Sequence, residues 1–318
     1  MSVDAAALVD TSAPILLTPP RKARPLAGVL LAAFGAIAFS GKAIIVKLGY
    51  RYGADAVTLL ALRMLVALPF FGLMALWTRR DVGRVRLDGS DRWRIIGLGF
   101  SGYYLASFLD FAGLEYITAT LERLILYLTP TLVLLIGMLV FERRASRRQI
   151  IALLISYVGV AAAFSHDLHI GGADIALGSV LVFLSALSYS IYLVGSGQLV
   201  ARVGAMRLTA YASSVACLFC IAQFLLTHSF VVLMNLAPNL YWLALLNGTV
   251  CTVLPVLTVM LAIARIGPAL AAQIGMIGPV STIIMSTLLL GEPMGLWQII
   301  GTVLVMSGVF LVTLPKTA

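Results

Sequence analysis

Ten long apolar runs, separated by short polar loops, restrict the fold of this chain more than any other feature of its sequence. Apolar runs of about 18 or more residues are typical of transmembrane helices, because the hydrocarbon core is about 30 Å thick and a helix rises about 1.5 Å per residue. Charged residues make up only 11% of the chain, whereas a soluble domain carries about 25%. The sequence therefore predicts an all-α integral membrane protein with ten transmembrane helices. The expected spans are residues 26–48, 56–77, 95–114, 118–140, 149–165, 174–197, 207–227, 240–264, 268–290 and 297–314.

Lys and Arg residues fall almost entirely in alternate loops between these runs. One face receives seventeen of them, counting those near both chain ends, and the other face receives Arg51 alone. Cytoplasmic loops carry such an excess of Lys and Arg, so we expect a multi-pass protein of the cell inner membrane with both termini cytoplasmic. Residues 1–25 are expected to form a disordered cytoplasmic tail. The net charge of +9 does not indicate a nucleic-acid partner, because the basic residues lie in short gaps and not on one solvated face.

The chain contains an internal repeat with a shift of 149 residues. With this shift Pro130 aligns with Pro279, and Gly159 aligns with Gly308. We therefore divide the chain into a first repeat of five helices, residues 26–165, and a second, residues 174–314. Because five is odd, the second repeat enters the membrane inverted relative to the first. Inverted repeats are the usual construction of secondary transporters, in which two halves rock around a central site.

Several segments carry a resemblance to a known family. They are the Leu62-Arg63 pair, the span with Pro130 followed by Glu142, and the segment GPVSTIIMSTLLLGEP with Pro279, Gly291 and Glu292. Over roughly residues 28–314 the chain resembles the EamA-domain family of the drug/metabolite transporter superfamily. The resemblance implies inverted five-helix repeats, a central cavity and export of small metabolites or drugs. In the repeat Glu142 aligns with Gly291 and not with Glu292.

Charged side chains inside a membrane cost at least about 2.5 to 3.5 kcal/mol each, so each is a candidate functional residue. Within the expected spans these are Lys42, Arg63, Asp110, Glu122 and Arg123, all in the outer third of the membrane and all in the first half of the chain. One interpretation is an outer-facing polar vestibule that binds the solute or carries a proton. The alternative is that Arg63 pairs with Glu122, or Lys42 with Asp110, and that these pairs only hold the helices together, or that the charged groups extend to the outer lipid headgroups. Glu122 and Arg123 point about 100° apart on a helix and cannot both face one partner.

Uncharged residues within the spans could also line a solute site. The candidates are Tyr103, Tyr104, Ser107, Tyr127, Tyr189, Tyr192, Asn247 and Gln273. The alternative roles are hydrogen bonding between helices and packing. Pro130 and Pro279 are expected to break their helices, because proline removes a backbone hydrogen bond, and broken helices often lie next to a transport site.

Together these features predict a secondary transporter that moves a small organic metabolite or drug by alternating access, in the efflux direction. Its expected partners are the solute, the lipid bilayer and a proton as coupling ion, for which Asp110 and Glu122 are the candidate carriers; three bases against two acids favour an anionic or zwitterionic solute. The alternative is a membrane-embedded enzyme acting on a lipid-linked substrate. We expect no enzyme, because acids lie in the spans of only one half and no His lies in a span. We expect no metal or other cofactor, since Cys217, Cys220 and Cys251 lie inside apolar runs.

Overall fold

The computed structural model describes residues 25–79, 87–141, 146–292 and 295–313, which are mostly helical and include no strand. The helices are α1 (Pro25–Arg51), α2 (Ala56–Arg79), α3 (Gly89–Gly99), α4 (Ala106–Leu114), α5 (Ala119–Leu126), α6 (Thr129–Phe141), α7 (Arg147–Val203), α8 (Ala205–Thr227), α9 (Phe230–Met234), α10 (Pro238–Gly248), α11 (Leu254–Ile266), α12 (Pro268–Gly275), α13 (Ile277–Met285) and α14 (Leu296–Thr313). Three π-helical segments join neighbouring helices: η1 (Phe100–Leu105), η2 (Thr249–Val253) and η3 (Ser286–Leu290). The expected tail at residues 1–25, apart from Pro25, and Glu142 lie outside the described residues.

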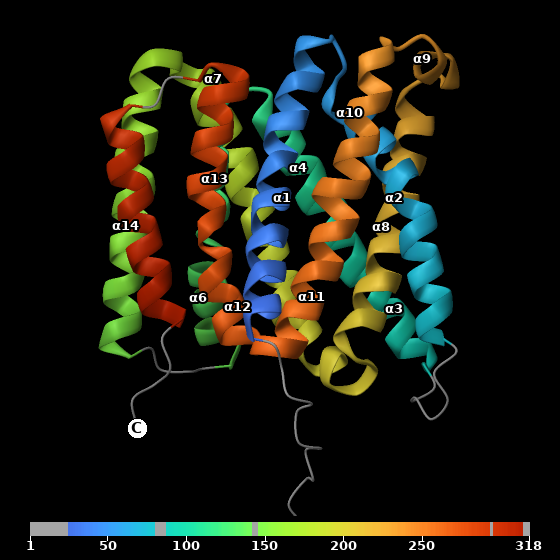
Figure 1. Ribbon diagram of the computed structural model, residues 1–318, viewed down its shortest axis with the longest axis horizontal. Coiled ribbons are helices and arrows are strands. Elements are labelled where there is room, and N and C mark those ends of the chain that lie inside the picture. The colour runs from blue at the N-terminus through green and yellow to red at the C-terminus, as the bar shows by residue number, and fades with distance from the viewer. Residues whose placement is uncertain (1–24, 80–86, 142–145, 293–294, 314–318) are drawn as a thin grey trace, which may run out of the picture.

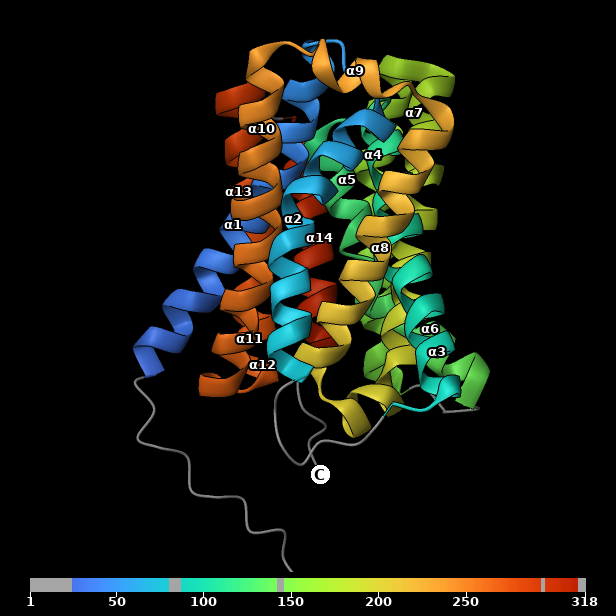
Figure 2. The same cartoon turned by 90° about the vertical axis from the view of Figure 1, so that its right-hand side faces the viewer.

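Within the described residues, nine helical stretches are long and apolar enough to cross a membrane, and Leu296–Leu311 is a shorter apolar helix. This confirms the all-helical membrane class, with the last expected span shorter than the others. The helices run roughly alongside one another as a bundle (Figure 1), and α9 lies across one end of it (Figure 2). The start of α1 and the end of α14 lie at the same end of the bundle (Figure 1).

Two boundaries differ from the expected spans. Helix α7 continues for 57 residues through both the fifth and the sixth expected spans; a straight helix of that length would be about 85 Å long, roughly twice the bilayer, and the ribbon turns over between the two spans (Figure 1). Helix α3 begins at Gly89, before the expected residue 95, because Asp88 and Asp91 form a capping box at its start. Asp91 also forms an ion pair with Arg202 of α7.

Helix boundaries recur along the chain with the shift of 149 residues. Helix α3 begins at Gly89 and α10 at Pro238, and the π-helical segments that follow them begin at Phe100 and Thr249. The eight-residue helices α5 and α12 are related in the same way. These helix boundaries therefore recur with the same spacing as the repeat predicted from the sequence.

Helix α14 packs closely against the first span of α7 through glycines. A Cβ atom on Gly159 would lie 2.8 Å from the carbonyl oxygen of Gly301, and a Cβ on Gly308 would lie 2.6 Å from that of Ala152. Small residues of this kind let membrane helices approach until their backbones touch. The two helices run antiparallel, because the residue number rises along one as it falls along the other.

Candidate functional site

Three charged side chains from three helices meet inside the bundle. The Nζ atom of Lys42 on α1 lies 2.5 Å from Oδ2 of Asp110 on α4 and 3.2 Å from Oε1 of Glu122 on α5. The side chains of Lys42, Asp110 and Glu122 are 5%, 4% and 0% exposed. We call these three residues the charge cluster. One ammonium group is thus shared by two carboxylates in a buried site.

The link between α4 and α5 determines how far Asp110 and Glu122 lie from the end of the helix bundle. Helix α4 ends at Leu114, and α5 begins after Thr118, whose side chain accepts a hydrogen bond from the backbone N–H of Leu121. Asp110 lies four residues before the end of α4, and Glu122 lies four residues after Thr118. The two carboxylates are therefore held about one turn from the same end of the bundle.

Arg123 makes its hydrogen bond outside the charge cluster and reaches α13 in the second half of the chain. Its Nη2 atom donates to Ser40 Oγ at 3.1 Å, and its guanidinium lies 5.0 Å from the ring centre of Phe39 and 5.4 Å from that of Tyr127. A Cβ atom on Gly278 of α13 would lie 2.7 Å from both Arg123 Nη2 and the Tyr127 hydroxyl. A larger residue at position 278 would force the ends of these two side chains to shift. Glu122 and Arg123 therefore face different partners.

The spans that contain Pro130 and Pro279 are both interrupted at matching positions. A turn at Tyr127–Leu128 interrupts the first span directly before Thr129 and Pro130. A turn at Met276 interrupts the second span, three residues before Pro279. A proline has no N–H to bond the carbonyl four residues earlier. The carbonyl that Pro130 releases, on Leu126, accepts from Thr129 Oγ1 at 2.7 Å, and the carbonyl that Pro279 releases, on Gly275, accepts from the Tyr127 hydroxyl at 2.7 Å.

Arg63 has a separate environment. Its Nε atom donates to Thr252 Oγ1 at 2.9 Å, and its guanidinium lies 5.2 Å from the ring centre of Phe111. Thr252 in turn donates to the carbonyl of Asn247 at 2.7 Å, within the π-helical segment η2 and the residues before it. Of the two pairings considered from the sequence, Lys42 with Asp110 is present, whereas Arg63 bonds Thr252 instead of Glu122.

Several of these buried groups have hydrogen-bonding atoms without partners among the described residues. They are Arg63 Nη1, Asp110 Oδ1, both Oε atoms of Glu122, Arg123 Nε and Asn247 Oδ1. The contact of Glu122 with Lys42 is an ion pair without hydrogen-bond geometry. Buried polar groups in proteins are normally hydrogen-bonded to protein or to water. Each of these atoms can therefore still donate or accept a hydrogen bond.

The remaining candidate residues lie elsewhere in the bundle. The hydroxyls of Tyr103 and Tyr192 are 3.3 Å apart, and Tyr189 stacks on Tyr192 with ring centres 5.6 Å apart. Tyr104 packs against Phe219, with ring centres 5.6 Å apart. The side chains of Ser107 and Gln273 are partly buried and make no hydrogen bond within the described part of the chain. Tyr103, Tyr189 and Tyr192 thus form an aromatic group of their own.

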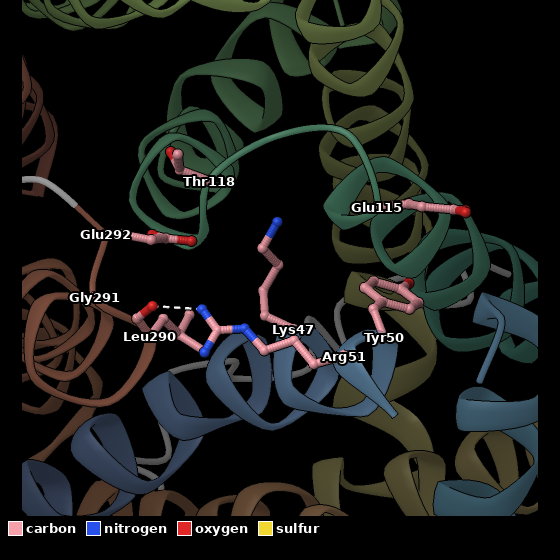
Figure 3. A pocket seen from close by; sticks show the side chains of 8 residues that line it. All are labelled: Lys47, Tyr50, Arg51, Glu115, Thr118, Leu290, Gly291 and Glu292. Atoms are coloured by element: carbon pink, nitrogen blue, oxygen red, sulfur yellow. Dashed lines mark hydrogen bonds between the residues drawn. The ribbon is translucent and has the colours of Figure 1, made fainter. Parts of the chain in front are cut away.

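A cavity of about 520 Å³ opens at the end of the bundle where α1 finishes (Figure 3). It is lined by Lys47, Tyr50, Arg51, Glu115, Thr118, Leu290, Gly291 and Glu292, and we call it the Lys47 cavity. These residues are not among the candidates chosen from the sequence. The sequence feature that could have identified this cavity is Arg51, which is the one loop cation expected on the face of the membrane opposite the cytoplasm.

Comparison with known proteins shows the family to which this chain belongs. The model of the EamA-like transporter family matches the chain twice, over residues 26–165 and 176–314. The chain belongs to the EamA-like transporter family. This family is part of the drug/metabolite transporter superfamily, so the resemblance seen in the sequence is confirmed.

Relatives of this EamA-like chain are named as transporters. One, "Uncharacterized transporter YcbK" of Bacillus subtilis, is 33% identical over 296 residues, which cover 90% of this chain and 91% of the relative. An "Uncharacterized transporter" of Archaeoglobus fulgidus is 25% identical over 285 residues, covering 89% and 96% of the two chains. A solved structure, titled "Crystal structure of protein", has the same fold, with a TM-score of 0.60 at 15% identity over 90% of this chain and 96% of the other. The chain is thus a multi-pass membrane transporter.

Proposed function

We propose that this protein is a secondary transporter that carries a small organic metabolite or drug out of the cell by alternating access. In this proposal its ten spans form two inverted five-helix repeats, and both termini are cytoplasmic. The contact between α14 and the first span of α7 is the single observation that carries the proposal.

The residues of this contact swap places when the two halves of the chain are aligned with the shift of 149 residues. A shift of 149 residues takes Ala152 to Gly301 and Gly159 to Gly308, so the contact of Gly159 with Gly301 becomes the contact of Gly308 with Ala152. An interface in which residue i meets j and j meets i is typical of a twofold axis. Because the two helices run antiparallel, the axis must lie across them, in the plane of the membrane. Halves related in this way support alternating access.

The charge cluster supports coupling to protons. Asp110 and Glu122 together carry two negative charges when ionised, and among the described residues Lys42 is the one cation that forms an ion pair with them, although Arg123 also lies near Glu122 and donates its hydrogen bond to Ser40. An excess negative charge is costly in a buried site. We propose that the cluster relieves this cost by taking up one proton, which it releases when the site opens to the other side of the membrane.

Solute flux in proteoliposomes tests the proposal. With an imposed pH gradient, wild-type protein should move a labelled solute, and the flux of Asp110→Asn and Glu122→Gln should no longer respond to the gradient. Asp174→Asn changes an exposed carboxylate and serves as the matched control. Proton-driven flux at the wild-type level in both cluster variants would exclude the coupling role.

The same assay separates a transporter from a membrane-embedded enzyme. Among the described residues, no group of three or more His, Cys, Asp or Glu side chains is arranged to hold a metal ion. If the protein is not an enzyme, as predicted, the solute recovered after flux should be chemically unchanged. Conversion of the solute during flux would favour the enzyme.

A further inference from the structure

The Lys47 cavity lies between three parts of the chain (Figure 3). The end of α1 contributes Lys47, Tyr50 and Arg51, the link between α4 and α5 contributes Glu115 and Thr118, and the residues that end η3 and follow it contribute Leu290, Gly291 and Glu292. Its volume of about 520 Å³ lies within the range of about 300 to 1,000 Å³ that is usual for small-molecule sites. It is large enough for a small organic solute.

The two cations of this cavity keep unused hydrogen-bond donors. Lys47 Nζ donates to the carbonyls of Leu114 and Ile117 at 3.2 and 3.0 Å, which occupies two of the three donors of an ammonium group. Arg51 donates from Nη2 to the carbonyl of Leu290, which leaves most of its five donors free. Neither cation forms an ion pair with an acid among the described residues.

Neither carboxylate at the cavity makes a hydrogen bond to Lys47 or Arg51 among the described residues, although Glu292 faces the Lys47 ammonium across the cavity (Figure 3). Both oxygens of Glu292 accept from the backbone N–H of Ala119, at 3.2 and 3.1 Å, in the first turn of α5. The positive end of a helix dipole stabilises a negative charge there. The carboxylate of Glu115 points away from the amino group of Lys47 (Figure 3). The cations are thus left without a carboxylate in hydrogen-bond contact.

We propose that the Lys47 cavity binds a small organic carboxylate, which accepts hydrogen bonds from the Lys47 ammonium and the Arg51 guanidinium. Charge-assisted hydrogen bonds of this kind are the strong ones, and the guanidinium fork fits the two oxygens of a carboxylate. Lys47 lies five residues after Lys42 on α1, about 7.5 Å along the helix. The Lys47 cavity is therefore a second solute-binding site on the transport pathway, next to the charge cluster. This transport role, but not the binding, rests on the proposed function.

Binding can be measured on the whole protein in nanodiscs of phosphatidylcholine. The probes are phenylacetate, phenylacetamide and phenethylamine, which have similar size but carry a negative, no and a positive charge. A ligand that binds only the folded protein raises its melting temperature in a saturable way. We expect this shift with phenylacetate and not with the amide or the amine. Equal shifts with all three probes, or none with phenylacetate, would overturn the proposal.

Substitutions locate the effect. Lys47→Gln and Arg51→Gln should each weaken phenylacetate binding about tenfold or more, the loss expected for a charge-assisted hydrogen bond. Arg51 is exposed, so Arg51→Gln should fold even if Lys47→Gln does not. The matched control is Arg94→Gln, an exposed arginine that lines a different cavity, and its affinity should equal that of the wild type. Unchanged affinity in Arg51→Gln would refute the site.

Two further experiments distinguish carboxylate binding from lipid binding and from the transport function. If phosphatidylglycerol in the nanodisc raises the melting temperature through Lys47 and Arg51 while phenylacetate has no effect, the site belongs to a lipid phosphate and the proposal is wrong. Flux measurements distinguish this proposal from the transporter function. Saturable carboxylate binding without solute flux would remove only the transport function, whereas flux without carboxylate binding would remove only this site.

Discussion

Removing the shared cation of the charge cluster should destabilise the protein strongly. Lys42→Met deletes the ammonium that lies 2.5 Å from Asp110 and 3.2 Å from Glu122, both of which are at most 4% exposed. Breaking a buried ion pair costs about 3 to 5 kcal/mol, because the remaining charge is left uncompensated. Here two carboxylates lose their partner together. We therefore expect the free energy of unfolding at neutral pH to fall by about 3 to 5 kcal/mol.

Neutralising the acids should restore most of this loss. A buried ion pair replaced by neutral groups of similar volume is often close to neutral in stability, so Lys42→Met combined with Asp110→Asn and Glu122→Gln should lie within about 1 to 2 kcal/mol of the wild type. The measurement is reversible unfolding in mixed micelles followed by circular dichroism. Arg265→Met is the control, because Arg265 is exposed and, within the described part of the chain, its side chain bonds only the carbonyl of Leu261 in its own helix. A triple variant no more stable than Lys42→Met would refute the electrostatic reasoning.

Three more predictions concern contacts between the two halves. Tyr127→Phe should lower the free energy of unfolding by about 1 to 2 kcal/mol, but by less in a Pro279→Ala background, where a backbone N–H can again bond the Gly275 carbonyl; a double-mutant cycle with no coupling would contradict this. Gly278→Ala should cost about 1 to 3 kcal/mol through overpacking against Tyr127, whereas Gly275→Ala, which meets nothing within 4 Å, should not destabilise in the same unfolding assay. Gly308→Ala should cost at least as much as Gly278→Ala, because its Cβ would lie 2.6 Å from a backbone oxygen.

The membrane class and the repeat could be predicted from local sequence patterns. Long apolar runs determine membrane spans because every backbone polar group must be satisfied inside lipid, which a helix does by itself. The pairing of Pro130 with Pro279 could be predicted too, since it needs only an alignment of the chain with itself. The early start of α3 was missed, although the capping box of Asp88 and Asp91 is a local signal.

The partners of the charged residues could not be predicted. Whether Lys42 meets Asp110, and whether Arg63 meets Glu122 or Thr252, depends on how each helix is rotated about its axis and which helices are neighbours. These are consequences of packing between segments up to 189 residues apart. The contact of Tyr127 with the Gly275 carbonyl depends on both helix breaks and on the crossing of the two halves.

By itself, the sequence determined that the chain is a helical membrane protein of the EamA-like family and that buried charges are concentrated in its first half. These properties follow from hydropathy and from similarity along the chain, which are both local. The tertiary structure alone decided that one lysine forms ion pairs with two acids, that Arg123 and Tyr127 reach the residues around Met276 in the second half of the chain, and that Lys47 and Arg51 share a cavity. Such contacts depend on the relative positions of helices, because side chains distant in sequence meet only after the helices have packed.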